Sequence, residues 1–218
     1  MSQQHQDHQS SFQLERIALF SDAVFAIAIT LLIIEIKVPN LPFDKNAFNE
    51  EFGHSMQEMI PEFIGFLISF MVIGSFWKAH HTLFGFVKDY DRKLLSLNNW
   101  FLLSIVAMPF TTAFMSRYLF IQPFFIYSCN VIISGLFQVR LWRYIVNTKH
   151  NLHTTLPKGM AQYKTATPLV VVSCFVMALL IHVIIDGIVA RVFLSLLFII
   201  NIFVERYFKK KYQLSKRY

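Results

Sequence analysis

The residues whose side chains could take part in binding or catalysis lie at the start of the first apolar stretch. Arg16, Ser21 and Asp22 are followed directly by the run AVFAIAITLLII. Ionisable side chains at membrane depth cost about 2.5–3.5 kcal/mol each on insertion scales, so they usually have partners and a task. Such groups can bind or relay cations, or they can hold helices together through hydrogen bonds.

A helix through this stretch separates the polar groups from an apolar stripe. At about 100° per residue, Ile27, Leu31 and Ile34 share one face, and Thr30 lies beside them. Asp22 points about 140° away from Ile27. The carboxylate and the apolar stripe are therefore predicted to face different surroundings.

Later apolar segments offer partners for the polar groups. The second segment ends in WKAHHTLF at 77–84, and the third begins with LLSLNNW at 94–100. Antiparallel packing would place both at the depth of Ser21 and Asp22, where an indole, imidazole or amide can bond a carboxylate or hydroxyl. A polar clamp that joins three helices is the favoured interpretation over a reactive site.

Composition places these residues in a membrane protein. The chain has 218 residues, is 55% hydrophobic and has a mean hydropathy of +0.48, which excludes an ordinary soluble domain. The polar N-terminus has no apolar segment behind basic residues, so no cleavable signal peptide is predicted. Cys129 and Cys174 lie in apolar runs and predict no disulfide framework.

Six apolar windows are long enough to cross a bilayer, which predicts an all-α, polytopic fold. They cover about 17–37, 61–87, 94–117, 122–146, 167–189 and 190–208. Three prolines are predicted to open spans, namely Pro61, Pro123 and Pro168. The predicted organisation is a polar tail at 1–15, a six-helix domain at 16–208 and a basic tail at 209–218.

The basic residues are distributed unequally between the two sides of the membrane. With a cytoplasmic N-terminus, inside segments hold fifteen Lys and Arg and outside segments hold four, while Lys78 lies within a span. This bias predicts cytoplasmic termini in a cell membrane, and it explains the net charge of +7 without a nucleic-acid partner. The first outside loop is acidic, which fits either a cation-attracting vestibule or a solvated helical loop.

The first three spans together resemble one family. The pattern of Arg16-x-x-x-Phe20-Ser21-Asp22 is similar to the RxxxFSD motif of the endosomal/lysosomal potassium channels, the transmembrane protein 175 family, and their bacterial homologues. Further similarity lies in Trp77-x-x-His80-x-x-x-Phe84 and in Asn98 with Pro109-Phe110. The resemblance covers about residues 16–112, and the single six-span unit resembles the bacterial members.

This resemblance implies a potassium-favouring cation channel, and not an enzyme, that assembles as a homotetramer in the lipid bilayer. The first helix would line a central pore, with Ile27 at the main constriction, Leu31 and Ile34 in further apolar layers and Thr30 as a hydroxyl ring that aids selectivity. Potassium is then a permeant ion, and neither a cofactor nor a resident metal is implied.

The resemblance also implies a bracing network for the pore helix. In it, the arginine, serine and aspartate of the motif bond to the tryptophan, histidine and asparagine of the neighbouring helices. Here these are Arg16, Ser21 and Asp22 with Trp77, His80 and Asn98, and Phe20 belongs to the same motif. His81 follows His80 directly, so the choice of bonding histidine stays open.

The chain contains no TVGYG segment and no two adjacent glycines. A carbonyl-lined filter of the usual potassium-channel kind needs such backbone, so selectivity is predicted to come from side chains.

Three other functions are alternatives to a channel. An intramembrane enzyme would need His80, His81, His182 and Asp186 in one site, yet the first two lie near the inside and the last two near the outside. No HExxH or serine-elbow motif is present. A proton- or cation-coupled transporter would use Asp22 as its coupling carboxylate, but the chain shows no inverted repeat. A purely structural assembly protein is the third alternative.

Overall fold

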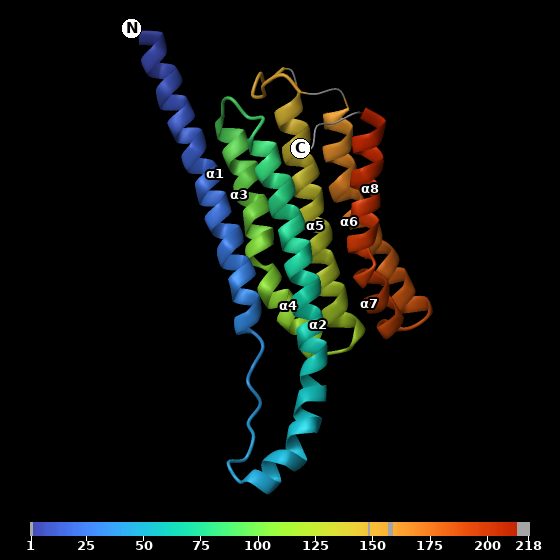
Figure 1. The fold of residues 1–218 in the computed structure, drawn as a ribbon. Coiled ribbons are helices and arrows are strands. Elements are labelled where there is room, and N and C mark those ends of the chain that lie inside the picture. Colours follow the sequence, from blue (N-terminus) through green and yellow to red (C-terminus); the bar gives the residue numbers. More distant parts are fainter. Residues whose placement is uncertain (1, 148, 157–158, 213–218) are drawn as a thin grey trace.

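The computed structural model describes residues 2–147, 149–156 and 159–212, which fold as a bundle of α-helices (Figure 1). The helices are α1 (Ser2–Ile34), α2 (Lys45–Phe84), α3 (Arg92–Val106), α4 (Met108–Arg117), α5 (Ile121–Val146), α6 (Met160–Ile184), α7 (Gly187–Ser195) and α8 (Leu197–Tyr212).

Five helical stretches in the described residues are long and apolar enough to cross a membrane, which confirms the all-helical, multi-pass class. They are Phe12–Ile34, Lys45–Phe84, Arg92–Arg117, Ile121–Val146 and Met160–Ile184. The predicted sixth span at 190–208 is not one continuous helix. Leu196 divides this region into the 9-residue α7 and the 16-residue α8, each shorter than the roughly 20 residues that a spanning helix needs. In Figure 1, α8 returns along α6.

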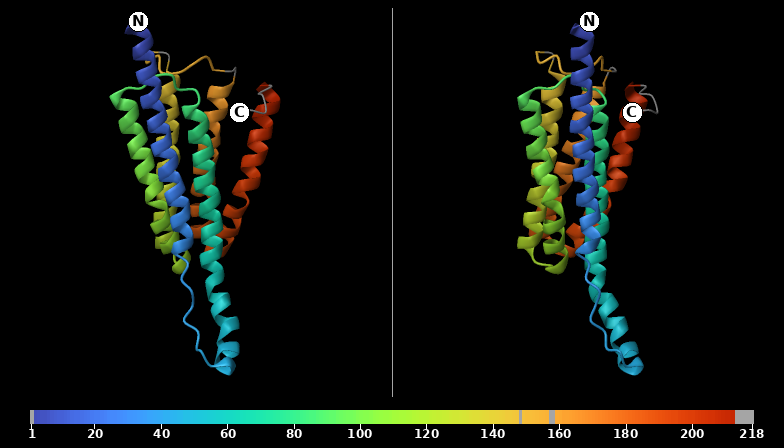
Figure 2. Two further views of the ribbon diagram at one scale, coloured as in Figure 1. Left: turned by 60° about the vertical axis from the view of Figure 1, so that its left-hand side comes forward. Right: turned by 90° about the vertical axis from the view of Figure 1, so that its left-hand side faces the viewer.

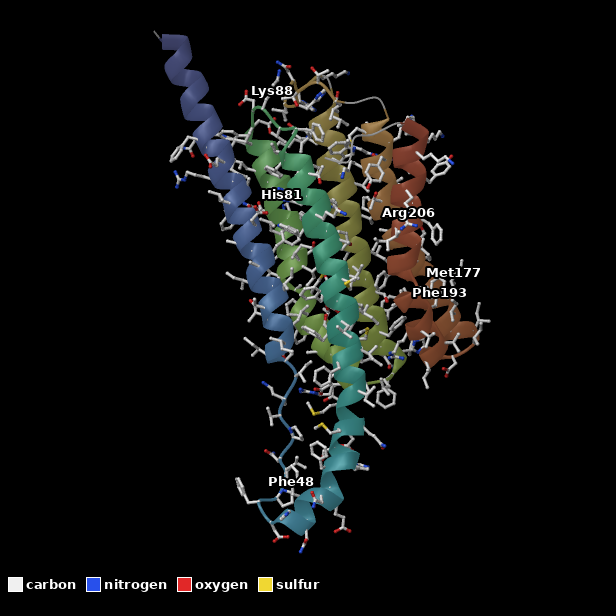
Figure 3. The ribbon with its side chains drawn as sticks, in the orientation of Figure 1. Phe48, His81, Lys88, Met177, Phe193 and Arg206 are labelled. Atoms are coloured by element: carbon white, nitrogen blue, oxygen red, sulfur yellow. The ribbon has the colours of Figure 1, made fainter. Side chains whose placement is uncertain are left out.

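The two described ends of the chain lie at the same end of the bundle (Figure 2). This end also carries the loop with Lys88, whereas Phe48 lies at the opposite end (Figure 3). The arrangement agrees with the predicted placement of both termini on one side. Residues 213–218 of the predicted basic tail lie outside the described residues.

Three helices begin earlier than the sequence predicted. Helix α2 starts at Lys45, where the Asp44 carboxylate accepts hydrogen bonds from two backbone N–H groups, so Pro61 lies inside the helix and does not open it. Pro168 likewise lies inside α6. Helix α1 starts at Ser2, so residues 2–15 of the predicted polar tail belong to the first helix. In α2, the Asp44 cap provides the start signal that proline was expected to provide.

The third predicted span, 94–117, is two helices with a break at Ala107. Pro109 has no N–H and its ring crowds the carbonyl four residues before it, which ends the regular hydrogen bonding of α3. Just beyond the break, the Thr111 and Thr112 hydroxyls donate to the Met108 carbonyl oxygen. Both bonds run from a hydroxyl to a carbonyl oxygen three or four residues earlier within α4, an arrangement that Ser and Thr side chains adopt inside helices.

Close packing and buried hydrogen bonds join the central helices. A Cβ atom on Gly65 would lie 2.7 Å from the Ser116 Cβ atom, so α2 and α4 approach each other as closely as a glycine allows. Nearby, Ser69 Oγ lies 2.7 Å from Thr112 Oγ1 and 2.9 Å from the Tyr127 hydroxyl oxygen. Because the Thr112 proton is donated to the Met108 carbonyl oxygen, Ser69 donates to Thr112 and the Tyr127 hydroxyl donates to Ser69. This chain of hydroxyls connects α4, α2 and α5 in the interior.

The α2–α3 and α5–α6 loops, at the end of the bundle that holds the N-terminus, also contact each other. Val87 and His153 form an isolated antiparallel bridge between the α2–α3 and α5–α6 loops. Asp91 caps α3 by accepting from the Leu94 N–H, and it also accepts a hydrogen bond from the Tyr144 hydroxyl of α5. Burial alone would raise the pKa of Asp91, but these hydrogen bonds outweigh it and hold the pKa below its usual value. The start of α3 is therefore fixed against α5.

Candidate functional site

Helix α1 has one buried face and one exposed face. Buried side chains recur at three- and four-residue spacing and pack toward α2, α3 and α4: Ser21, Phe25, Ala28 and Leu32. The predicted apolar stripe lies on the other side, with Ile27 59%, Leu31 39% and Ile34 60% exposed. The folded chain therefore leaves a row of large apolar side chains uncovered along its edge helix.

A directional chain of hydrogen bonds crosses three helices beneath the buried face. His80 Nε2 lies 2.8 Å from Asn98 Oδ1, and because an amide oxygen can only accept, this nitrogen carries the proton. The Asn98 amide nitrogen donates to Ser21 Oγ at 3.0 Å, and Ser21 Oγ donates to the Ile17 carbonyl oxygen at 2.9 Å. Each of the three polar side chains is at most 1% exposed. The chain links α2, α3 and α1 with a donor matched to every acceptor.

Aromatic rings enclose the imidazole of this chain. The His80 ring lies 4.5 Å from the Phe84 ring, and 5.5 Å from the rings of both Phe25 and Phe101, measured between centroids. The imidazole is thus held in orientation on its faces by rings from α1, α2 and α3. This packing keeps water away from the hydrogen bond between His80 and Asn98.

The motif aspartate belongs to a second, more exposed group. The Trp77 indole N–H donates to Asp22 Oδ1 at 2.9 Å, and His81 Nδ1 lies 3.7 Å from Asp22 Oδ2. The side chains of Asp22 and His81 are 34% and 66% exposed. Both histidines are therefore connected to the motif: His80 reaches Ser21 through Asn98, and His81 faces Asp22. Sequence reasoning left this choice open because it depends on the rotation of α2.

The structure places two motif residues apart from these contacts. Phe20 is 57% exposed, and the exposed Arg16 side chain has its guanidinium carbon 5.9 Å from the centroid of the Phe12 ring. The family resemblance implied contacts of the arginine with Trp77, His80 or Asn98. In the described part of the chain, Trp77 bonds to Asp22 and Asn98 bonds to Ser21, while His80 bonds to Asn98.

Thr30 lies beside the exposed apolar stripe. Its hydroxyl donates to the Ile27 carbonyl oxygen of the preceding turn at 2.9 Å. Because the proton is used within the helix, the oxygen lone pairs remain available on the exposed side. This orientation suits an interaction with a cation or a water molecule.

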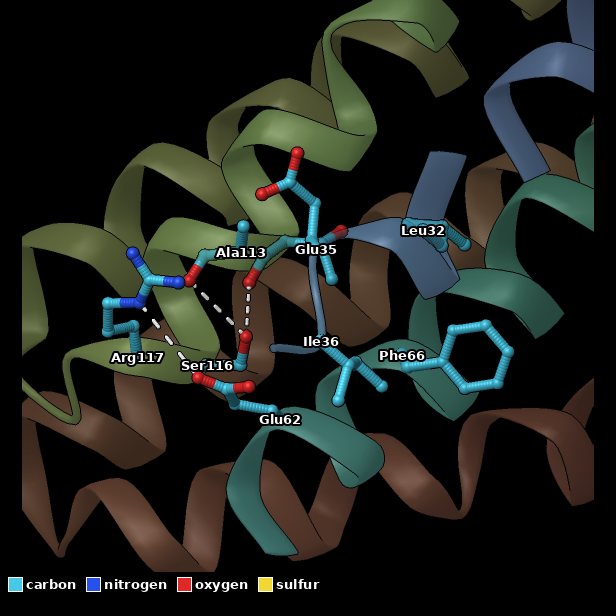
Figure 4. A pocket seen from close by; sticks show the side chains of 9 residues that line it. Leu32, Glu35, Ile36, Glu62, Phe66, Ala113, Ser116 and Arg117 are labelled. Carbon is cyan, nitrogen blue, oxygen red and sulfur yellow. Dashed lines mark hydrogen bonds and ion pairs between the residues drawn. The ribbon is translucent and has the colours of Figure 1, made fainter. Parts of the chain in front are cut away.

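A small pocket lies next to the C-terminal end of α1 (Figure 4). Its lining includes Leu32, Phe66 and Ser116. An ion pair also lines it, in which Arg117 Nε lies 3.9 Å from Glu62 Oε1. The Glu35 carboxylate points away from this pair (Figure 4). Sequence analysis did not anticipate the ion pair, since its partners come from the α2 and α4 helices and are far apart in the chain.

The residues of the rival enzyme site do not come together. His182 is in the last turn of α6 and contacts the Phe124 ring at 4.9 Å, at the end of the bundle opposite to the α2–α3 loop near His80. Asp186 instead caps α7 through the Ile188 N–H. Within the residues that the structure describes, no three His, Cys, Asp or Glu side chains gather as metal ligands.

Known proteins share both the motif region and the fold. The profile of a family described as endosomal/lysosomal potassium channel TMEM175 matches residues 16–109. A potassium channel of Streptomyces collinus is 35% identical over 140 residues, which are 62% of this chain and 66% of that protein. The human endosomal/lysosomal proton channel TMEM175 is 33% identical over 59% of this chain and 27% of its own length. The match thus spans less than two thirds of either relative.

The fold comparison extends over almost the whole chain. A crystal structure of a lysosomal potassium-selective channel TMEM175 homolog from Chamaesiphon minutus superposes with a TM-score of 0.69 at 26% identity, and covers 90% of this chain and 98% of that one. The family named by the RxxxFSD resemblance is therefore confirmed. The chain belongs to the TMEM175 family, which is a family of ion channels and not of enzymes.

Proposed function

We propose that this chain forms a potassium-favouring cation channel, in which four copies surround a pore lined by α1. The single observation that carries the proposal is the exposed stripe of Ile27, Leu31 and Ile34, which lies on the face of α1 away from the chain's own core. Membership of a channel family supports assigning this face to a pore. Both relatives and the structural neighbour described above are named as channels, two of them for potassium.

In this proposal, Ile27 is the gate. Four isoleucine side chains in a ring make a short apolar constriction, and such a constriction blocks ions by losing its water when it is narrow. Leu31 and Ile34 extend the apolar lining by about two further turns. Opening would widen the ring until a partly hydrated potassium ion passes.

Thr30 is proposed to provide the modest selectivity. Its hydroxyl proton is committed to the Ile27 carbonyl oxygen, so the free lone pairs of four threonines can replace water around a cation beside the constriction. Four hydroxyl oxygens offer fewer fixed ligands than a carbonyl filter does. We therefore expect a lower preference for potassium over sodium than such filters give.

The buried chain of His80, Asn98 and Ser21 is proposed to brace the pore helix, and the Asp22–Trp77 bond to do so nearer the surface. Asp22 then has a structural role and is not a coupling carboxylate. With the N-terminus cytoplasmic, as the Lys and Arg distribution predicts, this brace lies on the cytoplasmic side of the gate.

The test is electrical recording of the purified wild-type protein in planar bilayers, with potassium and sodium gradients. We expect unitary currents that reverse toward the potassium equilibrium potential, at rates above any transporter turnover. Slow, non-unitary flux that stops without a proton gradient would instead support a coupled transporter. Absence of any flux from correctly assembled protein would contradict both functions.

Replacing Thr30 with Val is expected to lower the potassium-to-sodium permeability ratio several-fold, because valine has nearly the same shape but no hydroxyl oxygen. Thr30→Ser is the matched control, since it keeps the oxygen and should keep the ratio close to wild type. The reversal potential under bi-ionic conditions measures both variants. An unchanged ratio in Thr30→Val would remove the hydroxyl ring from the mechanism.

A further inference from the structure

Arg16 occupies the same helical face as the proposed pore lining. Eleven residues separate it from Ile27, which at about 100° per residue leaves the two side chains only about 20° apart around the helix. Phe20 fills the turn between them and is 57% exposed. The Arg16 side chain is also exposed, and it lies over the exposed Phe12 ring, not against α2 or α3.

The acidic residues of the same helix segment face elsewhere. Glu15 is one residue away and therefore about 100° from Arg16, while Asp22 is about 120° away and bonds to Trp77. Between Phe12 and Ile34, α1 contains these three charged residues and no others. Its exposed stripe therefore has a single fixed charge, which is positive and lies at the N-terminal end.

The opposite end of the molecule has the opposite charge. Beyond α1, the part of α2 that projects from the bundle has a net negative charge, because it carries exposed Glu50, Glu51 and Glu58 against one exposed lysine, Lys45 (Figure 1). Cations near this end meet negative potential, whereas cations near the N-terminal end of the stripe meet a guanidinium. The two ends of the proposed conduction path thus differ in electrostatic sign.

We propose that Arg16 forms a cationic collar at the cytoplasmic mouth of the pore and makes the channel rectify, so that cations enter more readily from outside than from the cytoplasm. This inference rests on the proposed function, because it needs α1 to line a pore. It assigns Arg16 to ion supply at the mouth, and not to the brace formed by Ser21 and Asp22.

Because Arg16 lies far from the proposed gate, it should change the supply of cations at the mouth and not the selectivity of the pore. Arg16 lies about 16 Å along the helix from Ile27. This distance exceeds the Debye length of about 10 Å at 0.1 M salt, so the collar lowers the cation concentration at the mouth but leaves the constriction and Thr30 largely unaffected. Surface potentials of one to several kT at charged clefts change local ion concentrations by factors of about three or more.

The first experiment needs no variant. Currents of the wild type are recorded in excised membrane patches, where the cytoplasmic face is known, in symmetric KCl at +100 and −100 mV. We expect inward current to exceed outward current by about two- to three-fold at 0.1 M KCl. The ratio should approach one at 1 M KCl, where the Debye length is about 3 Å. A ratio that does not change with salt would overturn the collar while leaving the channel function intact.

Variants then test the residue. Arg16→Gln should bring the current ratio close to one at 0.1 M KCl, and its reversal potential under potassium/sodium bi-ionic conditions should equal that of the wild type. Arg16→Lys should keep the rectification because it keeps the charge. Glu15→Gln is the matched control: it removes a neighbouring charge of the opposite sign, so it should keep or increase the rectification and should not reduce it. Loss of rectification in Arg16→Lys, or equal effects of Arg16→Gln and Glu15→Gln, would contradict the proposal.

Discussion

Replacing Ile27 with Asn is expected to give a channel that conducts when the wild type is closed, with an open probability or leak conductance higher by about tenfold or more. A polar amide hydrates the ring, so the constriction no longer loses its water when it narrows. Removing a barrier of only about 1.4 kcal/mol already accounts for a tenfold change. Single-channel recording at zero stimulus measures this effect directly.

Ile33 provides the matched control for this gate. It is 48% exposed on the same helix and about 9 Å from Ile27 along the axis, but it points about 120° away from the proposed pore lining. Ile33→Asn introduces the same amide at a similar depth and should not raise the leak. If both variants leak equally, or if Ile27→Asn stays closed, Ile27 is not the constriction.

The second large effect is expected at the brace. Replacing Asn98 with Leu removes both hydrogen bonds of a residue that is 1% exposed, and leaves the His80 N–H and the Ser21 hydroxyl oxygen buried without them. Leaving a buried polar group unsatisfied costs about 1–3 kcal/mol, so the free energy of unfolding should fall by about 2–4 kcal/mol. For a chain of this size, the apparent melting temperature in detergent should drop by about 5–15 °C.

The next residue in the chain serves as the control for this variant. Asn99 is exposed on the same helix, so Asn99→Leu makes the same chemical change away from the chain of hydrogen bonds and should shift the melting temperature little. A double-mutant cycle sharpens the result: Ser21→Ala should cost less in Asn98→Leu than in the wild type, because the shared bond is already lost. Additive effects would argue against a coupled network.

The proposed gate and the proposed brace lie on opposite faces of one helix. Phe25 and Ala28 are each 1% exposed and lie beside Ser21 on the buried face. Any rotation of α1 that moved Ile27 relative to its neighbours would have to slide these side chains past His80 and Phe101. The packed aromatic rings therefore oppose rotation and hold the proposed pore lining in register.

Several features were determined by the sequence alone. The apolar stripe, its angular separation from Asp22 and the membrane-spanning class follow from helical period and hydropathy, which are local properties of the chain. The family was identified from Arg16, Ser21 and Asp22 together with Trp77, His80 and Asn98, since both residue type and spacing are visible without a fold. The comparisons confirm that identification.

Helix boundaries were less accessible to sequence reasoning. The start of α2 at Lys45 depends on the Asp44 cap, and the break at Ala107 depends on the missing N–H of Pro109. The last region divides at Leu196, although its hydropathy is continuous. Hydropathy windows detect apolar length and not the satisfaction of backbone groups. For this reason Pro61 was expected to open a span that in fact begins well before it.

Which polar groups contact one another depends on the packing of the helices. That His80 bonds Asn98 while His81 faces Asp22, and that Arg16 lies outside these contacts beside Phe12, depends on the rotation and depth of three helices relative to one another. That rotation is set by interlocking side chains from distant parts of the chain, such as Phe25, Phe84 and Phe101 around the imidazole. A sequence specifies the faces of each helix, but packing between helices selects which faces touch.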